Sequence, residues 1–183
     1  AKIRRLSLHG MSKGAADRYV KKYEHWDMVE CGWKYNMDNI QAALLIGQLD
    51  RIDQLWQRRE EISHRYEEAF DNIPGISYPR IKPGNNKSAR HLFTIWVEPD
   101  NRDNVLHGLQ ERGIGVAINF RAIHLLTYFA NEYKFERNMF PCAERIGDST
   151  VTIPLYPKLM DEEVTYIIDA LREVTRDETV FIS

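Results

Sequence analysis

The chain has 183 residues, a formal net charge of −2 and a hydrophobic fraction of 43%. This composition is ordinary for a globular protein, and its near-balanced charge gives no indication of a polyanion-binding surface. No apolar run approaches the length of about 20 residues needed to cross a membrane. Cys31 and Cys142 are isolated, which excludes a disulfide framework and a CxxC metal motif. We therefore expect a cytoplasmic protein that does not bind nucleic acid, membranes or metal ions.

The first 38 residues carry few periodic signals. A short alternation at residues 6–10 ends at a glycine, and a polar segment with embedded aromatic residues continues to Glu30. A segment of that length without periodicity is typical of a functional loop or of an arm that lies on a partner. The alternative is a solvated connection that its aromatic side chains attach to the core.

A long helix is the strongest pattern in the chain. Apolar residues recur every three or four positions throughout residues 39–72, which predicts one amphipathic helix. Asp38 is the expected N-cap, with Asn36 as the alternative. The free N–H groups and positive dipole beside Lys34 and Asn36 would suit an anion such as a phosphate. A well-capped helix preceded by solvated polar side chains is the simpler interpretation.

The remaining residues, 73–183, alternate between strand and helix patterns. Short β-branched or aromatic runs predict the strands, and three- and four-residue apolar spacing predicts the helices. The expected strands are 76–79, 91–97, 114–120 and 151–154. The expected helices are one ending at Gly113, one over 124–133, one over 141–149 and one beginning at Asp161. This order predicts a two-layer α/β domain with helices on one face of a small mixed or antiparallel sheet.

Several motifs in register resemble the DegT/StrS family of sugar aminotransferases. Residues 32–43 read GWKYNMDNIQAA and resemble the family's "GYN … IQAA" block, and residues 9–10 match the "HG" that precedes it. Residues 113–115 and 119–124 are similar to "GIG … HY-x-P-L-H", and residues 153–157 are similar to "LPLYP". The KYN and FRA variants look closest to the branch that aminates UDP-4-keto-arabinose.

The resemblance implies the C-terminal portion of a fold-type-I transferase dependent on pyridoxal 5'-phosphate (PLP). Residues 1–38 would be the tail of the large PLP domain and an interface loop. Residues 39–72 would form the long connecting helix between the domains. Residues 73–183 would form the small C-terminal α/β domain. The family also implies a homodimer.

The resemblance further assigns roles to individual positions. Asn36 and Lys34 would contact the PLP phosphate of the neighbouring subunit. Arg121 would pair with a diphosphate or with a carboxylate of the amino donor. Asn119 stands where the family has histidine, which keeps a hydrogen-bonding group but removes a titrating one. The positions expected to line the nucleotide-sugar pocket are Asn119, Phe120, Arg121 and His124.

No catalytic residue is assigned within this sequence. In the family, the lysine that binds PLP as a Schiff base lies upstream of "HG", in an "S-F-H-x-x-K" motif, so we expect it to precede Ala1. Residues 7–13 resemble that motif superficially. Their spacing is one residue longer and no Gly-Gly follows, so we expect Lys13 to be an exposed loop residue.

The resulting hypothesis is the C-terminal part of an aminotransferase that moves an amino group from glutamate to a nucleotide-linked keto sugar. Such chemistry supplies sugars for cell-surface polysaccharide or lipopolysaccharide. The partner would be a second copy or a complementing N-terminal half, and this segment alone would be inactive. The alternatives are a dimerising interaction module without cofactor, or a nucleotide-sugar binding module without chemistry.

Overall fold

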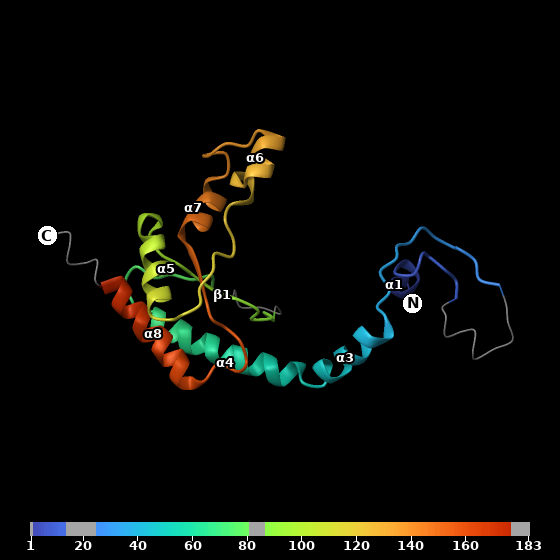
Figure 1. Ribbon diagram of the computed structural model, residues 1–183, viewed down its shortest axis with the longest axis horizontal. Coiled ribbons are helices and arrows are strands. Elements are labelled where there is room, and N and C mark those ends of the chain that lie inside the picture. The colour runs from blue at the N-terminus through green and yellow to red at the C-terminus, as the bar shows by residue number, and fades with distance from the viewer. Residues whose placement is uncertain (1, 14–24, 81–86, 177–183) are drawn as a thin grey trace. The chain divides into compact units, whose positions relative to one another are not determined.

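The computed structural model describes residues 2–13, 25–80 and 87–176, and the chain divides into two units, Ala1–Ile52 and Asp53–Ser183. The first unit contains α1 (Lys2–Leu6) and α3 (Asn39–Leu49). The second begins within α4 (Ile52–Phe70) and contains the remaining elements (Figure 1). The predicted division into large-domain tail, connecting helix and small domain stays a prediction.

Two backbone segments, one around Gly10 and the other around Glu30 and Gly32, approach closely in the first unit. Gly10 has a φ of +71°, and a Cβ there would lie 1.7 Å from the carbonyl oxygen of Glu30. A Cβ on Gly32 would lie 2.2 Å from the backbone nitrogen of Gly10. Only glycine permits this approach, which explains the glycines of both motifs in physical terms. Two isolated antiparallel bridges join the segments: Leu8 with Lys34, and Met11 with Met28.

The structure divides the helix predicted over residues 39–72 into α3 and α4. The two residues between them form a turn. There, Arg51 Nε donates to the carbonyl oxygen of Gly47 at 3.0 Å, and Arg51 N donates to that of Gln48 at 3.2 Å. The second bond tightens the last turn of α3, and both satisfy carbonyls that a continuing helix would use. The low helix propensity of glycine favours an ending at this point.

The sheet of the second unit is antiparallel. Strand β1 (Phe93–Trp96) pairs with β2 (Thr150–Ile153), with Phe93 opposite Ile153. The segments predicted as strands at 76–79 and 114–120 contribute only one antiparallel bridge each, Ser77 to Trp96 and Ala117 to Thr152. In the 76–79 segment, Pro79 has no N–H to donate to a neighbouring strand. In the 114–120 segment, Asn119 N donates to the side-chain Oγ1 of Thr152 at 3.2 Å instead of to a backbone oxygen, which ends the ladder.

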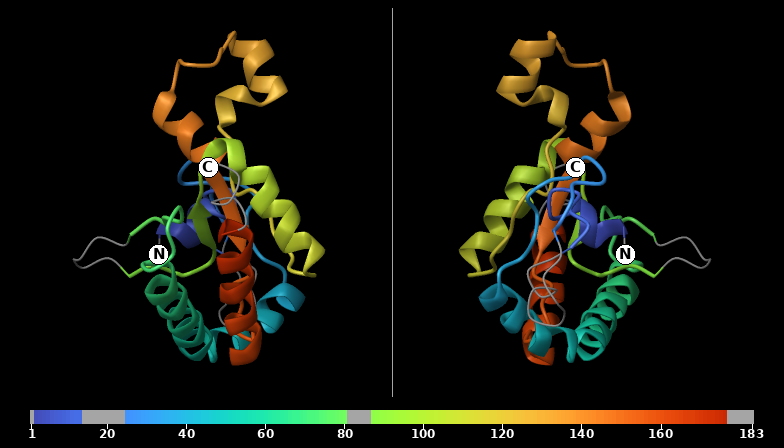
Figure 2. Two further views of the ribbon diagram at one scale, coloured as in Figure 1. Left: turned by 90° about the vertical axis from the view of Figure 1, so that its left-hand side faces the viewer. Right: turned by 90° about the vertical axis from the view of Figure 1, so that its right-hand side faces the viewer.

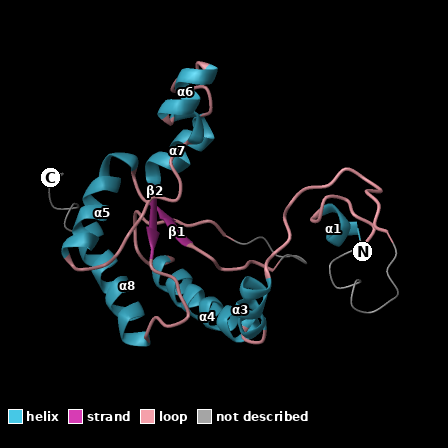
Figure 3. Cartoon of the chain, turned by 45° about the vertical axis from the view of Figure 1, so that its right-hand side comes forward, coloured by secondary structure: helices cyan, strands magenta, loops and turns pink. Residues whose placement is uncertain are grey.

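The predicted helices are present (Figure 3), and α7 (Pro141–Ser149) has the predicted bounds. The helix predicted over 124–133 is divided into a 3₁₀ turn and α6. The elements are η1 (Pro99–Asn101), α5 (Arg102–Glu111), η2 (Ile123–Leu125), α6 (Thr127–Tyr133), α7 (Pro141–Ser149) and α8 (Asp161–Arg176). Within this unit, α6 and α7 project away from α4 and α8, which lie side by side (Figure 2).

One hydrophobic core supports the second unit. Phe93 and Ile95, which alternate along β1 and therefore share a face, are buried, whereas Thr94 and Trp96 are only half-buried. The ring of Phe93 packs against Tyr66 of α4 with 5.1 Å between centroids. Core side chains from the helices come from α4, α5 and α8: Ile62, Tyr66, Phe70, Val105, Leu109, Val164, Ile168 and Leu171. The predicted two-layer α/β arrangement is confirmed.

Candidate functional site

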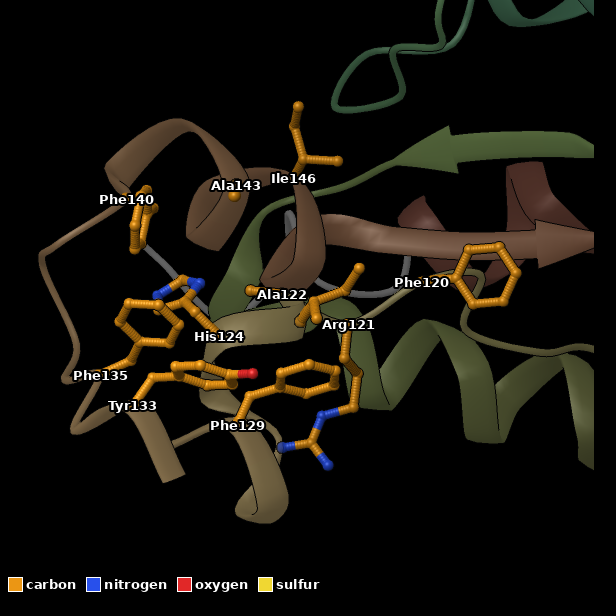
Figure 4. A pocket seen from close by; sticks show the side chains of 11 residues that line it. Phe120, Arg121, Ala122, His124, Phe129, Tyr133, Phe135, Phe140, Ala143 and Ile146 are labelled. Atoms are coloured by element: carbon orange, nitrogen blue, oxygen red, sulfur yellow. The ribbon is translucent and has the colours of Figure 1, made fainter. Parts of the chain in front are cut away.

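An open pocket with a volume of about 690 Å³ lies between η2, α6 and α7 (Figure 4). Aromatic rings form most of its wall, with Ile146 of α7 beside them. The ring centroids of His124 and Phe140 are 4.8 Å apart, and those of Phe135 and Phe140 are 5.6 Å apart. Tyr133 stacks on Phe135 at 5.6 Å. Rings at these distances and angles make favourable contacts and offer an apolar face to a ligand.

Close backbone packing holds the pocket floor. A Cβ on Gly147 of α7 would lie 2.5 Å from the backbone nitrogen of Ala122 and 3.2 Å from the carbonyl carbon of Arg121. The segment that carries Arg121 therefore rests directly on α7. The side chain of Arg121 is exposed and lines the pocket. Among the described residues, Arg121 has no ion-pair partner, so its charge is available to an anion.

His124 is held in place by a buried carboxylate. Its Nε2 lies 3.0 Å from Glu144 Oε1, and the two side chains are 7% and 6% exposed. Glu144 also accepts hydrogen bonds from the backbone N–H groups of Asn138, at 2.9 Å, and Phe140, at 3.1 Å. The bond from Asn138 first, and those from Phe140 and His124 after it, lower the pKa of Glu144. The carboxylate is therefore ionised at neutral pH.

The structure brings three of the four predicted substrate residues to this pocket. Phe120, Arg121 and His124 line it, although Phe120 is 69% exposed and lies apart from the other rings in Figure 4. Asn119 does not line the pocket, and its backbone nitrogen donates to Thr152. This fourth role therefore has no geometric support in the pocket.

The two predicted cofactor contacts, Lys34 and Asn36, lie in the first unit. Both are exposed, and within the described segments neither side chain forms a hydrogen bond or an ion pair. Asp38 caps α3 as predicted, because its carboxylate accepts from Gln41 N at 2.9 Å. A carboxylate thus already occupies the N-terminus of α3, which favours the simpler interpretation of a well-capped helix. An exposed ammonium and an exposed amide still suit a phosphate chemically.

Comparison with known proteins identifies the family of the chain. The model of the DegT/DnrJ/EryC1/StrS aminotransferase family matches residues 1–172. The chain belongs to this family. It is 36% identical over 181 residues to the spore coat polysaccharide biosynthesis protein SpsC of Bacillus subtilis, covering 96% of this chain and 46% of SpsC. It is 31% identical over 183 residues to the UDP-4-amino-4-deoxy-L-arabinose--oxoglutarate aminotransferase of Shewanella sediminis, covering 95% and 47%.

Solved structures of the family agree with the fold. The PLP-form of Spr1654 from Streptococcus pneumoniae is 32% identical, with a TM-score of 0.77 over 95% of this chain and 42% of that one. The chain spans about half the length of the curated relatives that it matches. The resemblance drawn from the motifs, and with it the fold of the C-terminal part of a PLP transferase, is therefore confirmed.

Several residues of the pocket were not singled out by the sequence. The rings of Phe129, Tyr133, Phe135 and Phe140 come from α6 and the loop after it, and no spacing rule connects them. Glu144 stood in a correctly predicted helix but received no role. An acidic residue in the first turn after a proline was the available signal, and a favourable helix dipole explains it equally well.

No helix in the described ranges is long and apolar enough to cross a membrane. No cluster of three or more His, Cys, Asp or Glu side chains in those ranges has the geometry of a metal site.

Lys13 lies in a bend and is half-buried, so it is less exposed than the sequence predicts.

Proposed function

We propose that the complete protein is a PLP-dependent aminotransferase that transfers an amino group from glutamate to a nucleotide-linked keto sugar. The family assignment supports the reaction class. The names of the two relatives, which concern spore coat polysaccharide and a UDP-linked amino sugar, support the substrate class. In this proposal, residues 1–38 belong to the large domain, 39–72 connect the domains, and 73–183 form the small domain of a cytoplasmic enzyme.

The observation that carries the substrate proposal is the aromatic pocket beside Arg121, which has no ion-pair partner in the part of the chain that the structure describes. A nucleotide sugar presents a planar base and two phosphates, which need a flat apolar surface and a cation. The rings around His124 offer the surface, and the guanidinium of Arg121 offers bidentate bonds to phosphate oxygens. The distribution of groups in the pocket therefore suits such a ligand better than an uncharged sugar.

Lys34 and Asn36 are the proposed contacts to the PLP phosphate. When bound, the cofactor supplies the electron sink for the transfer, and the protein supplies orientation. The exposed ammonium of Lys34 would offset the phosphate charge, and the Asn36 amide would donate a hydrogen bond. We assign no covalent role to Lys13, and we propose that these 183 residues alone do not attach PLP.

The apolar surface of α3 supports association with another chain. Five of its large apolar side chains are exposed and none is buried: Ile40, Leu44, Leu45, Ile46 and Leu49. Surfaces of this kind mark interfaces. We propose that a homodimer, or a complementing N-terminal half, covers them. The same observation favours the alternative function, a dimerising module that binds no cofactor.

Two measurements test the proposal. Isothermal titration with UDP-glucose should show binding that Arg121→Gln weakens about 10-fold, as expected for loss of a charge-assisted hydrogen bond. Arg172→Gln is the matched control, because the Arg172 side chain is 42% exposed but lies in α8, outside the pocket lining, and pairs with Asp169 at 2.8 Å. Equal losses in both variants, or no binding at all, would remove the pocket from the proposal.

The second measurement concerns the cofactor. The 183-residue chain is incubated with PLP, reduced with borohydride and examined by mass spectrometry. We expect no stable adduct on a specific lysine. A stoichiometric adduct that disappears in Lys13→Ala would overturn the assignment of the reactive lysine to a segment outside these residues.

A further inference from the structure

Glu144 is the point at which three parts of the pocket meet. The residue belongs to α7, yet all of its hydrogen-bond donors come from outside the helix body. Asn138 N reaches both carboxylate oxygens at 2.9 Å, Phe140 N reaches Oε1 at 3.1 Å, and His124 Nε2 reaches Oε1 at 3.0 Å. Arg137 adds a looser ion pair at 3.8 Å. The carboxylate thus joins α7, the loop 134–140 and η2.

This network determines which nitrogen of His124 carries a proton. Backbone N–H groups can only donate, so Glu144 acts as an acceptor, and its lowered pKa leaves it without a proton to offer. His124 Nε2 must therefore be the donor in their shared hydrogen bond. In the neutral ring the other nitrogen, Nδ1, is then an acceptor. Within the described part of the chain, Nδ1 forms no hydrogen bond.

The surroundings of His124 restrict its ring to this orientation. Phe140 packs edge-on against it at 4.8 Å, and Phe135 lies at 6.4 Å. The ring is buried but still lines the pocket. The cost of orienting the imidazole is therefore met by the fold before any ligand arrives, which is the general advantage of a preorganised contact.

We propose that Glu144 is a positioning residue that holds His124 with Nε2 on the carboxylate, so that Nδ1 accepts a hydrogen bond from a hydroxyl or ring N–H of the bound ligand. This inference rests on the proposed function, which places a nucleotide sugar in the pocket. It adds a residue that does not touch the ligand and acts only through the imidazole.

A double-mutant cycle in the full-length protein tests the proposal, with the affinity for UDP-glucose as the measured quantity. Glu144→Gln keeps an amide oxygen for the two backbone donors but removes the charge that orients His124. We expect about 3- to 10-fold weaker binding. His124→Phe keeps an aromatic ring but no nitrogen, and we expect a similar loss. In the His124→Phe background, Glu144→Gln should then have no further effect.

Glu173→Gln is the matched control, because it makes the same chemical change at a carboxylate of α8 that pairs with Arg112 and lies outside the pocket lining. It should leave the affinity unchanged. A nitrogen-15 NMR titration adds a signature that a structural role would not give: UDP-glucose should shift His124 Nδ1 in the wild type, and the shift should shrink in Glu144→Gln.

The possible results distinguish a failure of this inference from a failure of the proposed function. If UDP-glucose binds and Arg121→Gln weakens it, but His124→Phe does not, the inference fails and the proposed function stands. If Glu144→Gln costs as much with Phe at 124 as with His, Glu144 acts through the loop and the positioning role is refuted. If UDP-glucose does not bind the wild type, both fail.

Discussion

Replacing Gly147 by alanine tests whether contact between α7 and the 121–122 segment positions the pocket. The added Cβ would lie 2.5 Å from Ala122 N, against an ordinary contact of about 3.5 Å, so the segment must move by about 1 Å. The neighbours are backbone atoms and cannot rotate away. Overpacking of this kind costs about 1–3 kcal/mol, whereas Gly→Ala inside a helix gains about 1 kcal/mol. We expect a net destabilisation of up to about 2 kcal/mol.

Gly47→Ala in α3 is the control, because a Cβ there meets no heavy atom of the structure within 4 Å. This variant should be stabilised by about 1 kcal/mol, the effect of helix propensity alone. Amide hydrogen exchange measures the opening free energy of each helix separately. Gly147→Ala should speed exchange in α7 and weaken UDP-glucose binding. If it slows exchange in α7 as much as Gly47→Ala does in α3, the packing argument is refuted.

Three other substitutions probe the remaining structure. Phe93→Ala should cost about 3–5 kcal/mol in urea denaturation, because this 5% exposed ring contacts three other aromatic rings in the core; a loss below 1 kcal/mol would contradict it. Arg90→Gln should cost about 1.5–3 kcal/mol. The Arg90 hydrogen bond lowers the pKa of Glu60. The stabilisation by this ion pair is therefore complete above the ordinary glutamate pKa of about 4.3, and it is lost as the pH falls through the lowered pKa of Glu60. The free energy of unfolding of Arg90→Gln should consequently change less between neutral and acidic pH than that of the wild type. Asp38→Ala should raise amide exchange in α3 by the equivalent of about 1 kcal/mol, whereas a cap without effect would leave exchange at Gln41 unchanged.

The sequence predicted elements wherever a local rule decides them. The helix beginning at Asp161 was found because three acidic residues in its first turn precede a clear apolar stripe. The cap at Asp38 follows from side-chain chemistry alone. Extended segments were overestimated, because a strand needs a neighbour with free backbone groups. At Asn119, the backbone N–H donates to the hydroxyl of Thr152 instead of to a backbone carbonyl.

The candidate site was predictable only where a family motif covers it. Arg121 and His124 were found through the resemblance, and both line the pocket. Phe135 and Phe140 reach it from a loop whose conformation depends on hydrogen bonds to Glu144. Such a contact joins residues without regular spacing, so no periodicity reveals it. The same holds for Gly147. Only the packing of the 121–122 segment against α7 shows that this position has no room for a Cβ.

The apolar stripe of α3 shows what periodicity can and cannot determine. The same spacing continues through α4, where Ile62, Tyr66 and Phe70 are buried, yet the apolar side chains of α3 are exposed. An amphipathic pattern predicts that one face of a helix is buried, but it does not predict which residues cover that face. An isolated helix of 11 residues is shorter than the roughly 12–15 needed for stability in water. In the 183-residue chain alone, amides of α3 should therefore exchange fast while those of α4 and α8 are protected. Association with a covering chain should slow exchange in α3, and slow exchange in a monomer would show that the helix needs no such cover.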